Sequence, residues 1–288
     1  SLDAGHEVWL NSLLSGWWTH VKNTVGVVAA NVMEISELTL TATRQLPYPM
    51  MGKVKNVQFG DVGAKIFGQT MAMKEAFIAG GRAFWLREEA FKDATMKEVT
   101  GGGNPLKRAD AFSAEAFGTR SGNWAKFVDM MGHGATLGRG PMRALMAEDS
   151  FGKVVMFRGS LYEQGYVAAR QKGLQGEELS EAIAEFVFNP PREAREIALD
   201  TAKYNLLQSE MEGSLKQLGS FLGGNRFTRM LVPFYKTPTN GLLWTVDRTP
   251  FAKFSFYTRY QNAKAAGGRQ LAIANSRIIM GTGLMFLL

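Results

Sequence analysis

Apolar residues recur every three or four positions along most of this chain, and strict alternation of apolar and polar residues is rare. Such spacing is typical of helices with one buried face, whereas alternation would indicate half-buried strands. A wide apolar stripe covers residues 8–21, and a long helical region follows from about Asp61 to Val99, weakened at Gly80 and Gly81. The pattern therefore predicts an all-α fold.

Prolines and glycines divide the helical pattern into separate elements. "LPYPMMGKVKN" from Leu46 is predicted to be a loop. "TGGGNP" (100–105), "GHGATLGRGP" (132–141) and "FNPPREAREIA" (188–198) each place a proline in the first turn of a following helix, where its missing N–H is not needed. We expect an elongated multi-helix assembly with three consecutive parts, residues 1–131, 132–225 and 226–288.

The segment "MLVPFYKTPTNGLLWTVDRTPFAKFSFYTRYQNAK" (230–264) combines aromatic and basic residues with a single acid, Asp247. Thr237-Pro238 and Thr249-Pro250 resemble an N-cap followed by a first-turn proline, which predicts helices of about 238–247 and 250–267. Aromatic residues spread over more than half the circumference of the second helix. We therefore expect neighbours on two of its sides.

The net charge of +7 is concentrated near the C-terminal end of the sequence. Residues 226–288 hold nine basic residues against one acid, whereas residues 1–225 hold 24 basic and 25 acidic residues. A segregated basic segment favours a polyanion as partner, either nucleic acid or lipid head groups. The candidate polyanion contacts, of which the last three are expected at the rim of the segment, are Arg226, Arg229, Lys236, Arg248, Lys253 and Arg259.

Three interpretations of this basic aromatic segment remain open. It could form a core or subunit interface from which cations extend outward, an interfacial membrane segment, or a DNA groove. The pair Trp17-Trp18 has two interpretations, a membrane-interface anchor or part of a helical core. The candidate membrane or subunit contacts are Trp17, Trp18, Trp244, Phe251, Phe254 and Tyr257.

Motifs for catalysis or metal binding are weak. Cysteine is absent, and the three histidines lack the spacing of a metal site, so we expect no metal or other cofactor and no small-molecule substrate. Ser150 and Lys153 match a Ser-x-x-Lys pattern without its companion motifs. Glu34 with Glu37 could be an acid/base pair, but solvated helix surface is the favoured interpretation. We expect a non-enzymatic chain.

An apolar run covers residues 278–288 and is bounded by Arg277. A membrane-spanning helix needs roughly 20 apolar residues. The run supplies about half of that length, so the sequence predicts no complete span. Because the chain begins at Ser1 and stops within this run, we expect it to be part of a longer polypeptide.

Three blocks of the sequence together resemble a known protein family. They are "NSLLSGWWTHVKNTVG" (11–26), "GRGPMRALMAEDSFGKVVMFRGSLYEQGYVAARQKGL" (138–174) and "LVPFYKTPTNGLLWTVDRTPF" (231–251). In this order they are similar to the helical C-terminal regions of the large ejection proteins, or internal virion proteins, of short-tailed bacteriophages. Trp17-Trp18 departs from the resemblance, since a small residue or proline is expected there.

The resemblance implies a protein that is packed inside the virion and expelled into the host cell envelope. There it would assemble with copies of itself and with other ejection proteins into a channel for genome delivery. Host membrane lipids and the translocating phage DNA would be its other partners. The alternatives from other classes are a peripheral membrane-binding helical module and a fragment of a phage cell-wall hydrolase or nucleic-acid-processing enzyme.

Overall fold

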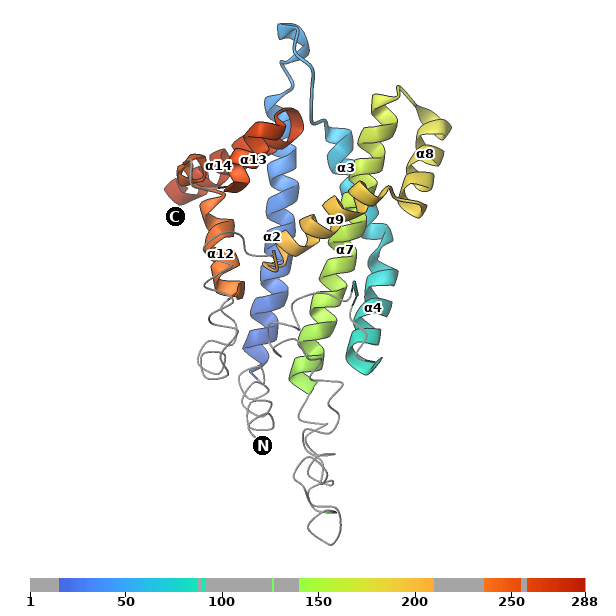
Figure 1. The fold of residues 1–288 in the computed structure, drawn as a ribbon, viewed down its shortest axis with the longest axis vertical. Helices are drawn as coiled ribbons and strands as arrows, with labels where there is room; N and C mark the ends of the chain where they lie inside the picture. Colours follow the sequence, from blue (N-terminus) through green and yellow to red (C-terminus); the bar gives the residue numbers. More distant parts are fainter. Residues whose placement is uncertain are drawn as a thin grey trace. The chain divides into compact units, whose positions relative to one another are not determined.

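The computed structural model describes residues 16–86, 90–91, 126, 140–209, 236–254 and 258–287. Helices account for most of these residues, and the described ranges contain no strand, which confirms the predicted all-α fold. The helices, with two short 3₁₀ turns, are α2 (Trp17–Arg44), η1 (Pro49–Met51), α3 (Phe59–Met71), α4 (Met73–Leu86), α7 (Gly140–Gln171), α8 (Gly176–Phe188), α9 (Arg192–Asn205), α12 (Lys236–Val246), η2 (Pro250–Lys253), α13 (Thr258–Ala266) and α14 (Gly268–Leu287) (Figure 1).

The chain forms two compact units, each drawn from three separate stretches of sequence. Unit 1 comprises Ser1–Gly26, Glu75–Gly152 and Glu210–Lys236, and unit 2 comprises Val27–Lys74, Lys153–Ser209 and Thr237–Leu288. The boundaries expected from the sequence, near residues 131 and 225, lie outside the described residues. The division into three consecutive parts and the elongated shape therefore stay predictions.

In unit 1, the described parts of α4 and α7 pack closely. Gly80 of α4 permits this, because a Cβ atom there would lie 3.1 Å from the carbonyl oxygen of Ala147. The rings of Phe77 and Phe151 meet edge to face with centroids 5.0 Å apart. His20 Nδ1 also lies 2.9 Å from Glu148 Oε1, which ties the first turns of α2 to α7.

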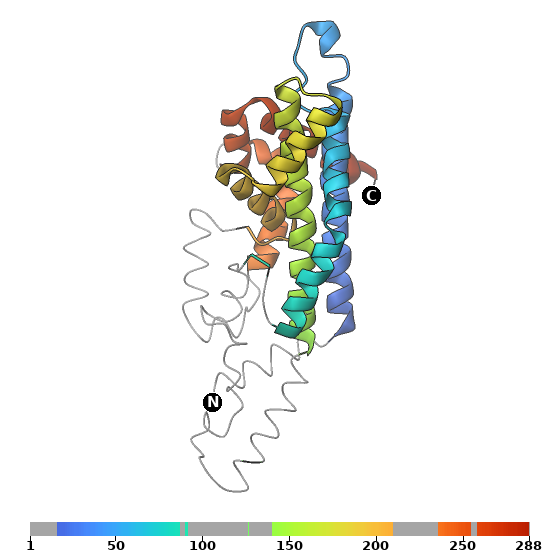
Figure 2. The same cartoon turned by 90° about the vertical axis from the view of Figure 1, so that its right-hand side faces the viewer.

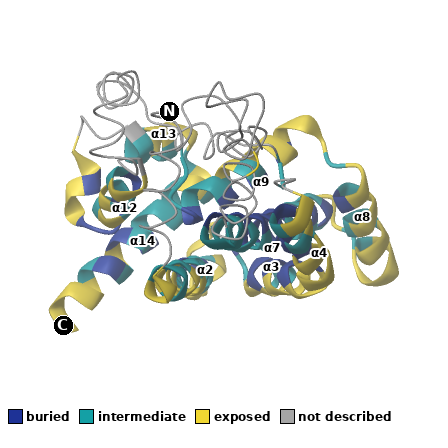
Figure 3. Ribbon diagram, turned by 90° about the horizontal axis from the view of Figure 1, so that it is seen from below, coloured by how far each residue is buried: buried dark blue, intermediate teal, exposed yellow. Residues whose placement is uncertain are grey.

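In unit 2, α2, α3 and α7 run side by side (Figure 2). Leu38 and Ala42 of α2 form an apolar cluster with Val62 of α3. The helices approach closely at Gly68 of α3, where a Cβ atom would lie 2.6 Å from the Cβ of Tyr162 on α7. A second cluster joins Ala252, Ile278 and their neighbours on α12 and α13. Figure 3 shows α7 mainly in the buried and intermediate colours, as expected for a central helix.

Several predicted helix boundaries are correct. The loop from Leu46 is confirmed, with only the short turn η1 inside it. Pro141 lies in the first turn of α7, as expected. Asn189 and the two prolines separate α8 from α9, but Pro191 is the N-cap residue of α9 and does not lie in its first turn. "TGGGNP" and the first 15 residues lie outside the described part of the chain.

Other predicted boundaries are wrong. The helical region after Asp61 breaks at Ala72, between α3 and α4, whereas Gly80, where a weakening was predicted, lies inside α4 at a close contact with α7. α12 begins at Lys236, so that Thr237 lies in its first turn and is not its N-cap. Pro250 starts only the 3₁₀ turn η2, and α13 is a separate helix from Thr258. Thr249 does not cap with its side chain, because its hydroxyl donates instead to the carbonyl oxygen of Val246 at 2.9 Å.

Candidate functional site

Unit 2 contains a network of buried charged side chains from helices far apart in the sequence. Each member is at most 29% exposed, and every ion pair in it links two different elements. We call this set the ionic network; it consists of Glu34, Glu37, Asp61, Glu163 and Asp247 with Lys65, Arg170, Arg248, Arg259, Arg269 and Arg277.

One half of the ionic network is centred on Lys65 of α3. Its ammonium group lies 2.6 Å from Glu34 Oε1 on α2 and 2.9 Å from Glu163 Oε2 on α7. Arg269, near the start of α14, bridges Glu163 to Asp61 and also donates to the carbonyl oxygen of Asn56 at 2.9 Å. This half therefore fastens α2, α3, α7 and α14 to one another.

The other half is centred on Glu37 of α2, which is fully buried. Arg277 of α14 donates from Nε to Glu37 Oε2 at 2.9 Å. Arg248, which follows α12, places Nη2 2.6 Å from Glu37 Oε1, an ionic contact whose angles do not make a hydrogen bond. The Arg248 guanidinium also stacks on the ring of Trp244, with 3.4 Å between its carbon and the ring centroid.

Tyr204 and Asn205 at the end of α9 connect the two halves. The Tyr204 hydroxyl donates to Asp247 Oδ2 at 2.8 Å and accepts from Arg248 Nη1 at 3.1 Å. The amide of Asn205 donates to Glu34 Oε2 at 2.6 Å. Arg259 closes the arrangement, because it donates to Asp247 at 3.2 Å and lies 5.0 Å from the Tyr204 ring centroid.

Burial and neighbouring charges act on the pKa values of Lys65 and Glu163 in opposite directions. Burial alone would lower the pKa of Lys65, but the carboxylates of Glu163 and Glu34 more than offset it and raise that pKa above its usual value. Burial alone would raise the pKa of Glu163, yet Lys65 and Arg269 hold it below its usual value. Folding therefore favours the charged forms of both groups, and the stability from Glu163 is lost as the pH falls through its lowered folded pKa.

At alkaline pH, Tyr204 should make the protein less stable. Burial raises the pKa of Tyr204 from 10.0 to about 12. The unfolded chain therefore loses this proton first, and stability that is fully present below pH 10 declines as the pH rises towards 12, by about 2–3 kcal/mol for a shift of this size. Denaturant unfolding at several pH values should show a shallower decline for Tyr204→Phe than for the wild type. Equal slopes would contradict the assignment.

Every carboxylate of the ionic network is already paired with at least one cation. Within the described ranges, no group of three His, Asp or Glu side chains could hold a metal ion. Removing one partner of a buried ion pair leaves an uncompensated charge, which is strongly destabilising. The chemistry that the arrangement supports is therefore charge neutralisation between helices.

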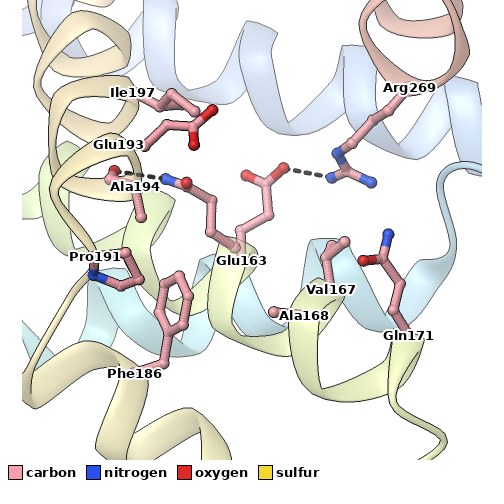
Figure 4. A pocket seen from close by; sticks show the side chains of 11 residues that line it. Glu163, Val167, Ala168, Gln171, Phe186, Pro191, Glu193, Ala194, Ile197 and Arg269 are labelled. Carbon is pink, nitrogen blue, oxygen red and sulfur yellow. Dashed lines mark hydrogen bonds and ion pairs between the residues drawn. The ribbon is translucent and has the colours of Figure 1, made fainter.

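A pocket of about 310 Å³ lies beside the network, between α7, α8 and α9 (Figure 4). Phe186, Pro191 and Ile197 supply apolar surface. Glu163 pairs with Arg269, and the Gln164 amide donates to the Ala194 carbonyl oxygen at 3.1 Å, while Gln171 and Glu193 are further polar residues in the lining. The pocket thus offers mainly an apolar cavity.

The candidate aromatic contacts are found in different settings. Trp17 and Trp18 stack with ring centroids 4.0 Å apart and are 62% and 57% exposed. Phe251 and Phe254 are also exposed, with ring centroids 5.8 Å apart. Trp244 is partly buried beneath Arg248. Tyr257 lies outside the described residues.

The three basic candidates whose side chains the structure describes, Arg248, Lys253 and Arg259, do not form one exposed surface. Arg248 is only 4% exposed, so the expectation that it lies at the rim is wrong. The reason is Glu37, which lies more than 200 residues earlier and provides a buried counter-charge. Arg259 is partly buried against Asp247, and only Lys253 is exposed as expected. Arg226, Arg229 and the side chain of Lys236 lie outside the described residues.

Two other interpretations of the sequence can be compared with the structure. The placement of Glu34 and Glu37 on solvated helix surface is wrong, because both carboxylates are paired with cations from other helices. Ser150 is fully buried and its hydroxyl accepts a hydrogen bond from the Ala90 amide at 3.2 Å. Lys153, the other residue of the Ser-x-x-Lys pattern, is also buried, with 2% of its surface exposed.

The sequence does contain a signal for the ionic network, in the spacing of its isolated charges on α2 and α3. Glu34 and Glu37 are the only acids in α2 and lie three residues apart, hence on one side of the helix. Asp61 and Lys65 are the only charged residues of α3 and lie four apart. Isolated charges that share one side of an apolar helix indicate an inward-facing polar side.

Comparisons of the chain with protein-family models, with curated proteins and with solved structures find no match.

Proposed function

We propose that this chain is a segment of a bacteriophage ejection protein, carried inside the virion and expelled into the host cell envelope. It assembles with copies of itself and with other ejection proteins into a conduit for genome delivery. Its role is to build and line the conduit, which requires no catalytic group. Membrane lipids and the passing DNA are the remaining partners of this assembly.

The observation that carries the proposal is the position, in the fold, of the sequence blocks that resemble the ejection proteins. The second block, 138–174, contains the whole of α7 and supplies Glu163 and Arg170. The third, 231–251, contains α12 and supplies Asp247 and Arg248. Two of the three blocks thus provide residues that hold unit 2 together, so the resemblance includes positions on which the fold depends.

Exposed apolar side chains also support an assembling role. Phe77, Trp85 and Leu86 on α4 are 61–73% exposed, and Phe286 and Leu287 at the end of α14 are more than 80% exposed. Large exposed apolar groups of this kind mark surfaces that contact another protein or a membrane when they gather into patches.

The proposal predicts that the purified protein forms closed rings or tubes. Electron microscopy with and without detergent, together with sedimentation over a range of concentrations, would measure this. The variant Glu37→Gln serves as a comparison for assembly. It loses a buried ion pair inside unit 2, but its exposed apolar groups are those of the wild type. A discrete monomer both with and without detergent would contradict the proposal that the chain builds a conduit.

A further inference from the structure

Residues 27–43 of α2 and 59–71 of α3 form a helical hairpin with the loop between them, at whose edge Arg44 and Lys53 are exposed. Within these two helical stretches the charged residues lie inside, and the large exposed residues are apolar. Every charged side chain of residues 27–43 and 59–71 belongs to the ionic network. The large side chains on the outer side are 44–60% exposed and are all apolar. We call these the hairpin face: Val28, Val32, Phe59, Ile66, Phe67 and Met71.

The hydroxyl groups on the outer side are satisfied within their own helices. Ser36 and Thr39 donate to the carbonyl oxygens of Val32 and Ile35 at 2.8 and 2.7 Å. Thr43 and Thr70 make the same bond one turn back, both at 2.9 Å. Where α2 meets α3, Asn31 and Gln69 bond to each other through both amide groups. The hairpin face therefore offers a partner almost no free hydrogen-bonding group.

We propose that the hairpin face contacts the hydrocarbon of a lipid bilayer. In lipid, every polar group must be satisfied internally, and this surface meets that condition. A protein interface would normally carry a polar rim and about one hydrogen bond per 100–200 Å². A second copy of the chain is therefore the less suitable occupant.

The length of α2 and the residues of the loop agree with lipid as the partner. α2 has 28 residues, and its unit 2 part, Val27–Arg44, is about 27 Å long at 1.5 Å per residue. Within the described part of the chain it is the helix that is long and apolar enough to cross a membrane, a test of length and composition alone. The sequence-based expectation of no complete span considered only the run after Arg277. In the loop, Met50 and Val54 are 94% and 81% exposed beside Lys53, a combination suited to the head-group boundary.

The ionic network explains how such an apolar face can coexist with charged helices. Glu34, Glu37 and Lys65 are paired inside unit 2, so no unpaired charge has to enter lipid. The hairpin face contacts the bilayer, while the opposite side of the hairpin stays packed against the other helices of unit 2. The inference rests on these contacts and would hold for a membrane-bound protein of any biological role, so its failure leaves the test for rings and tubes unaffected.

Site-specific fluorescence can test the hairpin face directly. Because the chain has no cysteine, Val32→Cys and Phe67→Cys can each carry one environment-sensitive NBD label. Phe188→Cys is the matched control, since Phe188 is 83% exposed in the same unit but on α8. With vesicles of zwitterionic phosphatidylcholine, the two face labels should shift to the blue and be quenched by nitroxides on the lipid acyl chains. The Phe188 label should show neither effect.

A charge variant gives a second measurement. Val32→Glu combined with Phe67→Glu should weaken vesicle binding by about tenfold or more, because each carboxylate would enter lipid. Phe188→Glu should leave binding unchanged, and circular dichroism should show that both variants keep their helices. The apolar contact should also persist at high salt.

Two outcomes would overturn the proposal. In one, the face labels are quenched by the nitroxide lipids no more than the Phe188 label. In the other, they shift to the blue without lipid as the protein concentration rises, which would assign the face to a second copy of the chain.

Discussion

Replacing Glu37 with glutamine should lower the free energy of unfolding by about 3–5 kcal/mol, the usual cost of breaking a buried ion pair. Glutamine keeps the shape of the side chain but removes the charge that Arg248 and Arg277 share. Arg248 is 4% exposed, so water cannot replace the lost carboxylate. Urea unfolding followed by circular dichroism would measure the difference.

The matched control is Glu196→Gln on α9. Glu196 also pairs with an arginine, Arg192, at 2.9 Å, but both side chains are more than 60% exposed. An exposed pair between neighbouring turns contributes little, so this variant should unfold like the wild type. If both variants lost the same stability, burial would not be the source of the Glu37 effect.

Replacing Lys65 with methionine should also cost about 3–5 kcal/mol, through the two carboxylates that it leaves without their shared partner. Methionine fills a similar volume, so the change in packing is small. Lys74→Met, at an exposed position of α4, is the control and should have little effect.

Measurements at acid pH and a second mutation can show whether the stability lost in Lys65→Met comes from charge or from packing. The loss should shrink as the pH falls, because Glu163 can then become protonated and no longer needs a cation. Adding Glu34→Gln should recover part of the loss, so the two changes should be less than additive. A loss that is independent of pH and fully additive would identify packing as the cause.

Local features of the fold were predictable because local residues determine them. Apolar spacing gave the helices, and the prolines near 141 and 190 marked helix starts through backbone geometry. The break at Ala72 was not predictable in this way. It lies between two apolar helices, and no proline or glycine marks it.

The ionic network could not be assembled from the sequence. Glu37 and Arg277 are 240 residues apart, and Lys65 and Glu163 are 98 apart. Helical spacing shows which residues share one side of a helix, but it does not show which helix packs against that side. The basic excess near residue 250 therefore suggested an external polyanion, although Arg248 and Arg277 pair with a buried carboxylate of the same chain, Glu37.

The origin of these cations affects the order in which unit 2 can fold. Four residues from the C-terminal stretch, Arg248, Arg259, Arg269 and Arg277, act as built-in counter-ions for acids placed mainly on earlier helices. During synthesis, α2 and α3 emerge long before these arginines. Contacts that close long loops form late, and exposed intermediates are prone to aggregate. Glu37 in the nascent hairpin must therefore remain without Arg248 and Arg277 until α12 to α14 have been made.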